Sequence, residues 1–165
     1  MGNQEAVPAL IIVLNDKDRF VRRRAAKALT HLNNQSAVVP LMNALHDPER
    51  KVRYRSAEAL GKIGDKQAVP PLLNTLNDPS RTVRRKVIIA LGLIGSEEAV
   101  APITWRLRDT SSQVRSAAEH VLKHQFNPSR PGMRKNRSRN KICPHCHKPV
   151  IPNTNYCPSC GASLS

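Results

Sequence analysis

The sequence repeats itself at a fixed step of 31 residues, four times between residues 4 and 125. Each copy opens with Ala-Val, continues with an aspartate and a Val-Arg pair, and closes with a leucine. In the third copy these are Ala68-Val69, Asp78, Val83-Arg84 and Leu91. A period of 20–50 residues is typical of stacked repeats, in which each unit buries its apolar face against its neighbours. We therefore expect a solenoid.

Each copy predicts two short helices. In the third copy the first apolar stripe is Val69, Leu72, Leu73 and Leu76, which follows the i, i+3, i+4, i+7 spacing of a helix. Asp78-Pro79 then interrupts the pattern, and we expect the aspartate to cap a second helix that the proline begins. Gly95 ends that helix as a left-handed residue would. No strand alternation appears before residue 127, so the predicted fold class is all-α, an α-solenoid of four helical hairpins.

The repeated pattern A-V-P-x-L-(x)5-D-P-x-x-x-V-R resembles the HEAT repeat, in the short form of phycobilisome lyase-like proteins, over about residues 4–125. The resemblance implies an armadillo-like solenoid that offers a surface to partners, and it carries little information about chemistry. It supplies no catalytic residue of a lyase. The related deoxyhypusine hydroxylases hold two irons with repeated His-Glu dipeptides, and this chain has no such dipeptide, so the resemblance does not imply that activity.

Aspartate and arginine recur in register. We expect a structural ladder in which each aspartate caps a helix and accepts hydrogen bonds from a nearby arginine, in its own unit or the adjoining one. The residues of this ladder are Asp16 with Arg22, Asp47 with Arg53, Asp78 with Arg84, and Asp109 with Arg115.

The remaining basic residues give the chain a formal net charge of +15, of which residues 127–165 carry +7 without a single acidic residue. Such a charge suggests attraction to an acidic partner or to nucleic acid. The alternative is a solvated face that binds nothing. The candidate anion-binding or partner-binding residues are Arg23, Arg24, Arg55, Arg85, Lys86, Arg134, Lys135, Arg137 and Arg139.

The four cysteines have the spacing C-x2-C-x10-C-x2-C, in which two tight knuckles complete a tetrahedron that suits Zn²⁺. The stretch resembles the zinc ribbon family, although His147 stands where that family usually has glycine, so His145 and His147 remain alternative ligands. A disulfide framework is disfavoured in a reducing compartment. Four thiolates leave no open coordination position, so we expect one structural zinc ion. Its predicted ligands are Cys143, Cys146, Cys157 and Cys160.

These patterns divide the chain into an α-solenoid (1–126), a basic flexible linker (127–141) and a zinc ribbon (142–165). Two side chains in the solenoid depart from the repeat. Ile12 and Trp105 occupy a position that is asparagine in the two middle units. Each is either a half-covered surface residue or a contact for a partner.

The sequence favours a non-enzymatic interaction or scaffold protein whose main partner is another protein. Nucleic-acid association is the alternative, although five aromatic residues provide poorly for base stacking. A phycobilin lyase-like or chaperone-like role is a lesser alternative that rests on the resemblance alone. His120 and His124 lack the glutamate of a metalloprotease motif. We see no signal peptide or membrane span and expect a cytoplasmic protein, while the oligomeric state stays open.

Overall fold

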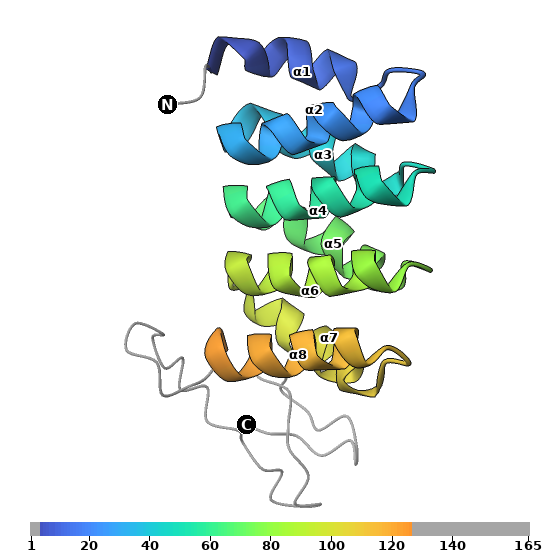
Figure 1. Ribbon diagram of the computed structural model, residues 1–165. Coiled ribbons are helices and arrows are strands. Elements are labelled where there is room, and N and C mark those ends of the chain that lie inside the picture. Colours follow the sequence, from blue (N-terminus) through green and yellow to red (C-terminus); the bar gives the residue numbers. More distant parts are fainter. Residues whose placement is uncertain (1–3, 127–165) are drawn as a thin grey trace, which may run out of the picture. The chain divides into compact units, whose positions relative to one another are not determined.

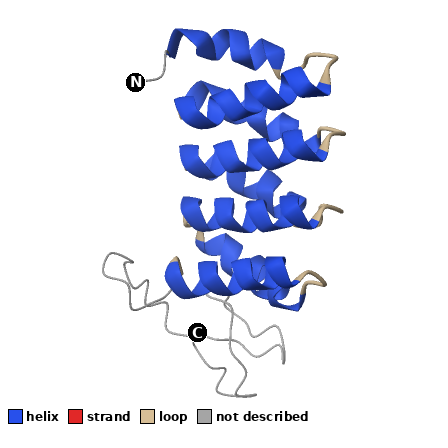
Figure 2. Cartoon of the chain, viewed as in Figure 1, coloured by secondary structure: helices blue, strands red, loops and turns tan. Residues whose placement is uncertain are grey.

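The computed structural model describes residues 4–126, and residues 1–3 and 127–165 lie outside the described part. The chain divides into two compact units, residues 1–127 and 128–165. The described part is a stack of four helical hairpins, which confirms the predicted α-solenoid, and no strand occurs within it (Figures 1 and 2).

The second helix of each hairpin is the longer one, and these four helices lie side by side in one layer with the first helices behind them (Figure 1). The second helices are α2 (Arg19–Leu32), α4 (Arg50–Ile63), α6 (Arg81–Ile94) and α8 (Ser112–His124). The first helices are α1 (Val7–Val13), α3 (Val38–Asn43), α5 (Val69–Thr75) and α7 (Val100–Trp105).

The first helices begin and often end in 3-10 turns instead of running as one uniform helix. The opening turns are η1 (Gln4–Ala6), η2 (Gln35–Ala37), η4 (Lys66–Ala68) and η5 (Glu97–Ala99), and the closing turns are η3 (Ala44–His46) and η6 (Arg106–Arg108). In the third unit Asp65 accepts a hydrogen bond from the amide of Gln67 and so caps η4. Proline at the start of α1 and α5 fits a turn whose amides have no helical partner.

The second helices begin two residues later than the sequence predicted. The N-cap of α6 is Ser80, and Asp78 instead accepts a hydrogen bond from the Ser80 amide at 2.8 Å. Asp47 and Asp109 make the same bond to Glu49 and Ser111, at 2.7 and 2.9 Å. The ladder aspartates therefore close the turn before the helix, and the prediction that they cap it is wrong. Their position leaves the carboxylate free to meet an arginine.

Glycine ends two of the second helices in the predicted left-handed conformation, with φ of 76° at Gly64 and 72° at Gly95. Asn33 takes the same place after α2, with φ of 50°. Asparagine is one of the few other residues that tolerate this conformation. The second helix of the first unit therefore ends in the same way as those of the middle units.

The core is a single aliphatic column. Leu29, Leu60 and Leu91 recur at the repeat step and are fully buried, each contributing about 2 kcal/mol of hydrophobic stabilisation. Neighbouring second helices approach closely at Gly61, where an added Cβ would lie 2.6 Å from the Cα of Ala90 in the next unit. At Gly92 an added Cβ would instead meet a side chain, 2.6 Å from Cγ1 of Val121. Small residues at this position therefore set the distance between neighbouring second helices.

Candidate partner-binding surface

The aspartates and arginines of the predicted ladder pair across neighbouring units. Arg53 donates to both carboxylate oxygens of Asp78, from Nε at 2.6 Å and from Nη2 at 3.0 Å. The same two-point contact joins Arg22 to Asp47 at 2.6 and 3.0 Å. It also joins Arg84 to Asp109 at 2.9 and 2.8 Å. Bidentate arginine–carboxylate pairs are the strong, geometrically specific kind of ion pair.

Each arginine also holds the turn of its own unit. Nη1 of Arg53 donates to the carbonyl oxygens of Asp47 and Pro48, at 2.8 and 3.1 Å. The hydrogen bonds from Arg84 hold the pKa of Asp109 below its ordinary value, and the same contact raises the pKa of Arg84. These paired groups are satisfied within the solenoid, so the three inter-unit pairs stabilise the stack and are not available to a ligand.

The ladder is open at both ends of the described solenoid. Arg115 keeps the bonds from Nη1 to the carbonyls of Asp109 and Thr110, at 2.8 and 3.2 Å. Among residues 4–126 no carboxylate meets its Nε or Nη2. At the other end the Asp16 carboxylate accepts from the amide of Asp18 at 2.7 Å, and no arginine of residues 4–126 pairs with that carboxylate, although Arg22 donates to the Asp16 carbonyl oxygen at 2.8 Å.

The candidate surface cations fall into two groups. Arg55 and Lys86 both donate to Glu58, at 2.6 and 2.9 Å, and both stack on the ring of Tyr54. Burial lowers the pKa of Lys86, but its hydrogen bonds to Glu58 and Tyr54 outweigh burial and leave the pKa raised. These two cations are therefore committed to a cluster between α4 and α6.

The other candidate cations of the described residues are Arg23, Arg24 and Arg85, and their charges are available to a partner. Arg23 lies with its guanidinium 5.9 Å from the ring centre of Phe20, and Arg24 is exposed on α2. Arg85 is exposed on α6. No hydrogen bond or ion pair joins these three to another residue within the described range. Arg134, Lys135, Arg137 and Arg139 lie outside the described residues.

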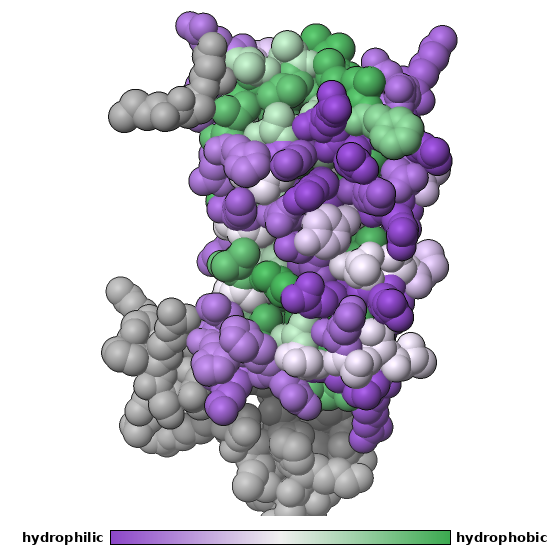
Figure 3. All heavy atoms as spheres, viewed as in Figure 1, coloured by the Kyte–Doolittle hydropathy of each residue, from purple (hydrophilic) through white to green (hydrophobic). Residues whose placement is uncertain are grey.

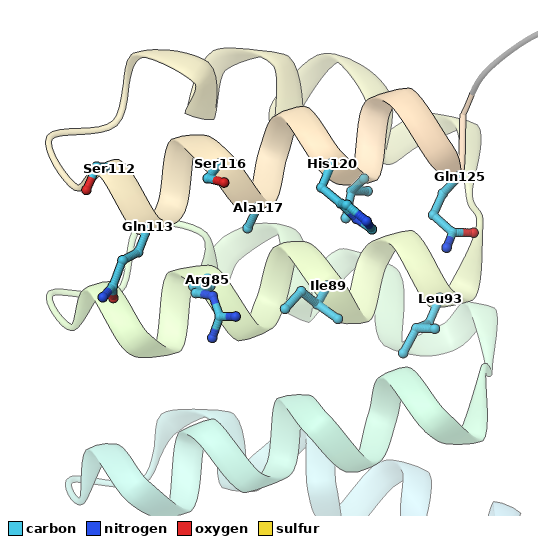
Figure 4. A pocket seen from close by; sticks show the side chains of 10 residues that line it. Arg85, Ile89, Leu93, Ser112, Gln113, Ser116, Ala117, His120 and Gln125 are labelled. Atoms are coloured by element: carbon cyan, nitrogen blue, oxygen red, sulfur yellow. The ribbon is translucent and has the colours of Figure 1, made fainter.

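A groove of about 940 Å³ lies on the second-helix face, the surface formed by α2, α4, α6 and α8. Figure 4 shows Arg85, Ile89 and Leu93 from α6 facing side chains from α8. Those from α8 are Ser112, Gln113, Ser116, Ala117, His120 and Val121, followed by Gln125. The groove thus runs along the line where the last two second helices meet.

The repeat register explains why the groove forms here. At successive steps of 31, the position of Ala117 holds Arg24, Arg55 and Lys86 in the earlier units. Lys86 on α6 reaches Glu58 on α4, whereas the equivalent pair between α6 and α8 is Ala117 with Ile89. An ion pair is replaced by a small apolar pair, which leaves an apolar floor. Sequence reasoning missed this groove, although the loss of long side chains in the fourth copy was a readable signal.

Several other sequence features can be placed. Ile12 and Trp105 are exposed, with 74% and 71% of their surface accessible. The rings of His120 and His124 lie with centres 4.5 Å apart. Within residues 4–126 no three histidine, cysteine or acidic side chains are grouped to hold a metal ion. The predicted zinc ligands Cys143, Cys146, Cys157 and Cys160 lie outside the described residues.

Comparison with known families identifies the repeats. The sequence model of the HEAT repeats matches residues 1–48 and 38–123. The chain belongs to the HEAT-repeat family. Residues 142–164 match the zinc-ribbon domain, which supports zinc binding by the C-terminal segment. No helix of the described HEAT solenoid is long and apolar enough for a transmembrane segment.

Solved structures share the HEAT solenoid. The complex of CpcE and CpcF of phycocyanin lyase from Nostoc sp. PCC7120 matches with a TM-score of 0.67 and 32% identity, over 73% of this chain and 53% of that one. Human deoxyhypusine hydroxylase matches with a TM-score of 0.62 and 29% identity, over 71% and 42%. This chain therefore spans about half the length of these proteins. A designed armadillo repeat protein in complex with the peptide (KR)4, at 19% identity and a TM-score of 0.61, shares the fold alone. No curated protein sequence matches the chain.

Proposed function

We propose that the chain is a non-enzymatic interaction scaffold that binds a protein partner in the groove between α6 and α8. The observation that carries the proposal is the replacement of the inter-unit ion pair by Ile89 and Ala117, which leaves an apolar floor on an otherwise polar face. HEAT solenoids generally use such extended surfaces for protein partners, which supports the choice.

The chemistry of the groove defines the partner segment. Leu93 is 54% exposed and Ile89 is partly exposed, so apolar side chains of a partner would remove them from water. Arg85 lies at the other end of the α6 side and offers a guanidinium to a carboxylate. Arg85 and Leu93 are eight residues apart on one helix, a rise of about 12 Å, which about four extended residues cover. The expected ligand is therefore a short segment with an acidic residue at one end and two apolar residues at the other. Either chain direction meets this requirement.

A randomised peptide library panned against the full zinc-loaded chain tests this site. Peptides with one acidic and two apolar residues should be enriched. Ala117→Arg should reduce their affinity at least about tenfold, because it fills the groove with a side chain that two other units carry at this position. Arg85→Glu should have a similar effect, whereas Arg24→Glu, on the same face but far along the chain, should have little. Enriched peptides that bind Ala117→Arg as well as the wild type would exclude the groove.

Nucleic-acid association is the second candidate, supported by the uncommitted cations Arg23, Arg24 and Arg85 and by the basic segment 127–141. Contacts to phosphates give affinity that falls steeply with salt and depends little on sequence. Anisotropy titrations with duplex DNA and structured RNA, from about 50 to about 300 mM salt, measure this directly. A log–log slope of several units that becomes shallower in Arg23→Glu/Arg85→Glu would favour nucleic acid over a protein partner. Absence of binding at the lowest salt would remove this candidate.

The zinc ribbon would supply a second contact, tethered to the solenoid and therefore present at a raised effective concentration. We propose that Cys143, Cys146, Cys157 and Cys160 hold one zinc ion, which would act as a structural staple. Metal analysis of the purified chain should give one zinc per chain, and a cysteine-to-serine change at any of the four should lower that ratio. An unchanged ratio in His145→Ala/His147→Ala would separate the cysteine set from the histidine alternatives.

The similarity to the CpcE–CpcF phycocyanin lyase complex supports a lesser candidate, an accessory role on a bilin-carrying protein. Its test is an absorbance shift when a bilin is added to the full chain. We rank it below the scaffold role because no residue of this chain is assigned to bilin chemistry.

A further inference from the structure

The two ends of the described solenoid carry different chemistry at equivalent positions. Ala26, Ala57 and Ile88 recur at the repeat step and are fully buried. The fourth copy has Glu119 there, and it is exposed. The close-approach position of Gly61 and Gly92 holds Lys123 in the fourth copy, again exposed. A polar outer face is the usual cap of a repeat stack. The face of α8 that would meet a further unit is thus charged.

The opposite end keeps the apolar residues of an internal interface. Leu10 and Ala28 are partly exposed, although their equivalents Leu41 and Ala59 are fully buried. Ala6 and Val21 show the same difference from Ala37 and Val52. At the Ala28 position the later units contact the unit before them, as Ala90 contacts Gly61. Hydrophobic residues accordingly gather over α1 in Figure 3.

Asp16 adds a charge requirement to this apolar surface. Its carboxylate is held by the Asp18 amide at 2.7 Å, as that of Asp47 is held by the Glu49 amide at 2.7 Å. In the later units a bidentate arginine from the preceding unit completes this arrangement. Asp16 is preorganised for the same contact, and within residues 4–126 no arginine provides it. We call this surface the N-terminal end face; it comprises Ala6, Leu10, Asp16, Val21 and Ala28.

We propose that the N-terminal end face binds a HEAT-type helical hairpin of a different protein, whose second helix brings an arginine to Asp16. The proposal concerns a surface separate from the groove between α6 and α8. Charge complementarity at Asp16 and continuity with the internal interfaces both specify this occupant. A second copy stacked head to tail would bring its Arg115 to Asp16, but it would also bury the charged Glu119 and Lys123 against the apolar residues of this face, so it fits poorly. Pairing two N-terminal end faces brings no free ladder arginine to Asp16, since Arg22 is engaged with Asp47.

An added repeat serves as the probe hairpin. A copy of residues 66–96 placed directly before Gln4 preserves the step of 31 residues. It also sets its Arg84 25 residues before Asp16, the separation of Arg84 and Asp109. If the face accepts a hairpin, the helical circular dichroism of the full chain should rise in proportion to the added residues. The midpoint of thermal unfolding should rise by about 4 °C or more.

Variants separate specific docking from mere lengthening. Alanine at the added Arg84 should remove part of the gain, Asp16→Asn should remove a similar part, and combining the two should do little more than either alone. In the unextended chain Asp16→Asn should leave the midpoint nearly unchanged. An added repeat without helical signal, or one indifferent to its arginine, would overturn the proposal.

Self-association is measured on the unextended chain by sedimentation velocity over a range of concentrations. We expect a monomer. An oligomer that dissociates on Asp16→Arg would show that a second copy occupies the face, which would overturn the assignment to a different protein. Neither result bears on the groove, because Ala117 and Arg85 lie on other helices and remain unchanged in these variants.

Discussion

Asp78→Ala breaks one rung of the ladder and should be among the most damaging polar substitutions in the solenoid. The change removes two hydrogen bonds from Arg53 and one from the Ser80 amide. Only 13% of the Arg53 side chain and 4% of the Asp78 side chain are accessible to water. Removing one partner of a buried ion pair lowers the free energy of unfolding by about 3–5 kcal/mol. Because Arg53 retains some exposure and its Nη1 bonds, we take the lower end and add about 1 kcal/mol for the turn.

The expected loss is therefore about 4 kcal/mol. Asp16→Ala is the matched control, because Asp16 has the same repeat position and the same turn bond but no arginine on its carboxylate, and it should lose only about 1 kcal/mol. Urea unfolding of the full zinc-loaded chain, followed by circular dichroism, measures both. With a slope of about 2 kcal/mol/M, the midpoints should fall by about 2 M and 0.5 M. Equal losses for the two variants would refute the claim that the inter-unit ion pair stabilises the stack.

Three further predictions concern stability. Arg84 lowers the pKa of Asp109 in the folded state, so the stabilisation is present above the unfolded pKa of about 4 and is lost as the pH falls below it. Acid titration of the free energy of unfolding should show this decline, and Asp109→Asn should flatten it. Gly61→Ala forces a Cβ against the backbone of Ala90 and should lower the free energy of unfolding by about 1–3 kcal/mol, whereas a neutral result would mean that the helices separate freely. Ser56 is fully buried, and its hydroxyl has no hydrogen-bond partner within the described residues. Ser56→Ala should therefore leave the free energy of unfolding unchanged or raise it by up to about 1 kcal/mol. A clear decrease in urea unfolding would mean that the hydroxyl has a partner.

The sequence alone determined the repeating unit and its fold. The apolar stripes recur four times at the period of 31 residues, and the glycines after the second helices of the two middle units are a further short-range signal. Gly64 and Gly95 adopt the expected left-handed conformation because that requirement is local. The start of the second helices was predicted wrongly because an aspartate before a helix can serve in two ways. Asp78 can cap a helix or close the turn before it, and the arginine of the preceding unit favours the second.

Only the tertiary structure decided which residues of different units meet. Asp78 pairs with Arg53, 25 residues away, and Glu58 pairs with both Arg55 and Lys86, so these two candidate surface cations are not available to a partner. These partners depend on how far one hairpin is displaced along the next. That displacement is set by close contacts such as Gly61 on Ala90, which no local pattern encodes. The groove between α6 and α8 and the unlike ends of the solenoid follow from the same stacking, because a side chain is buried, paired or exposed only according to what the neighbouring unit places against it.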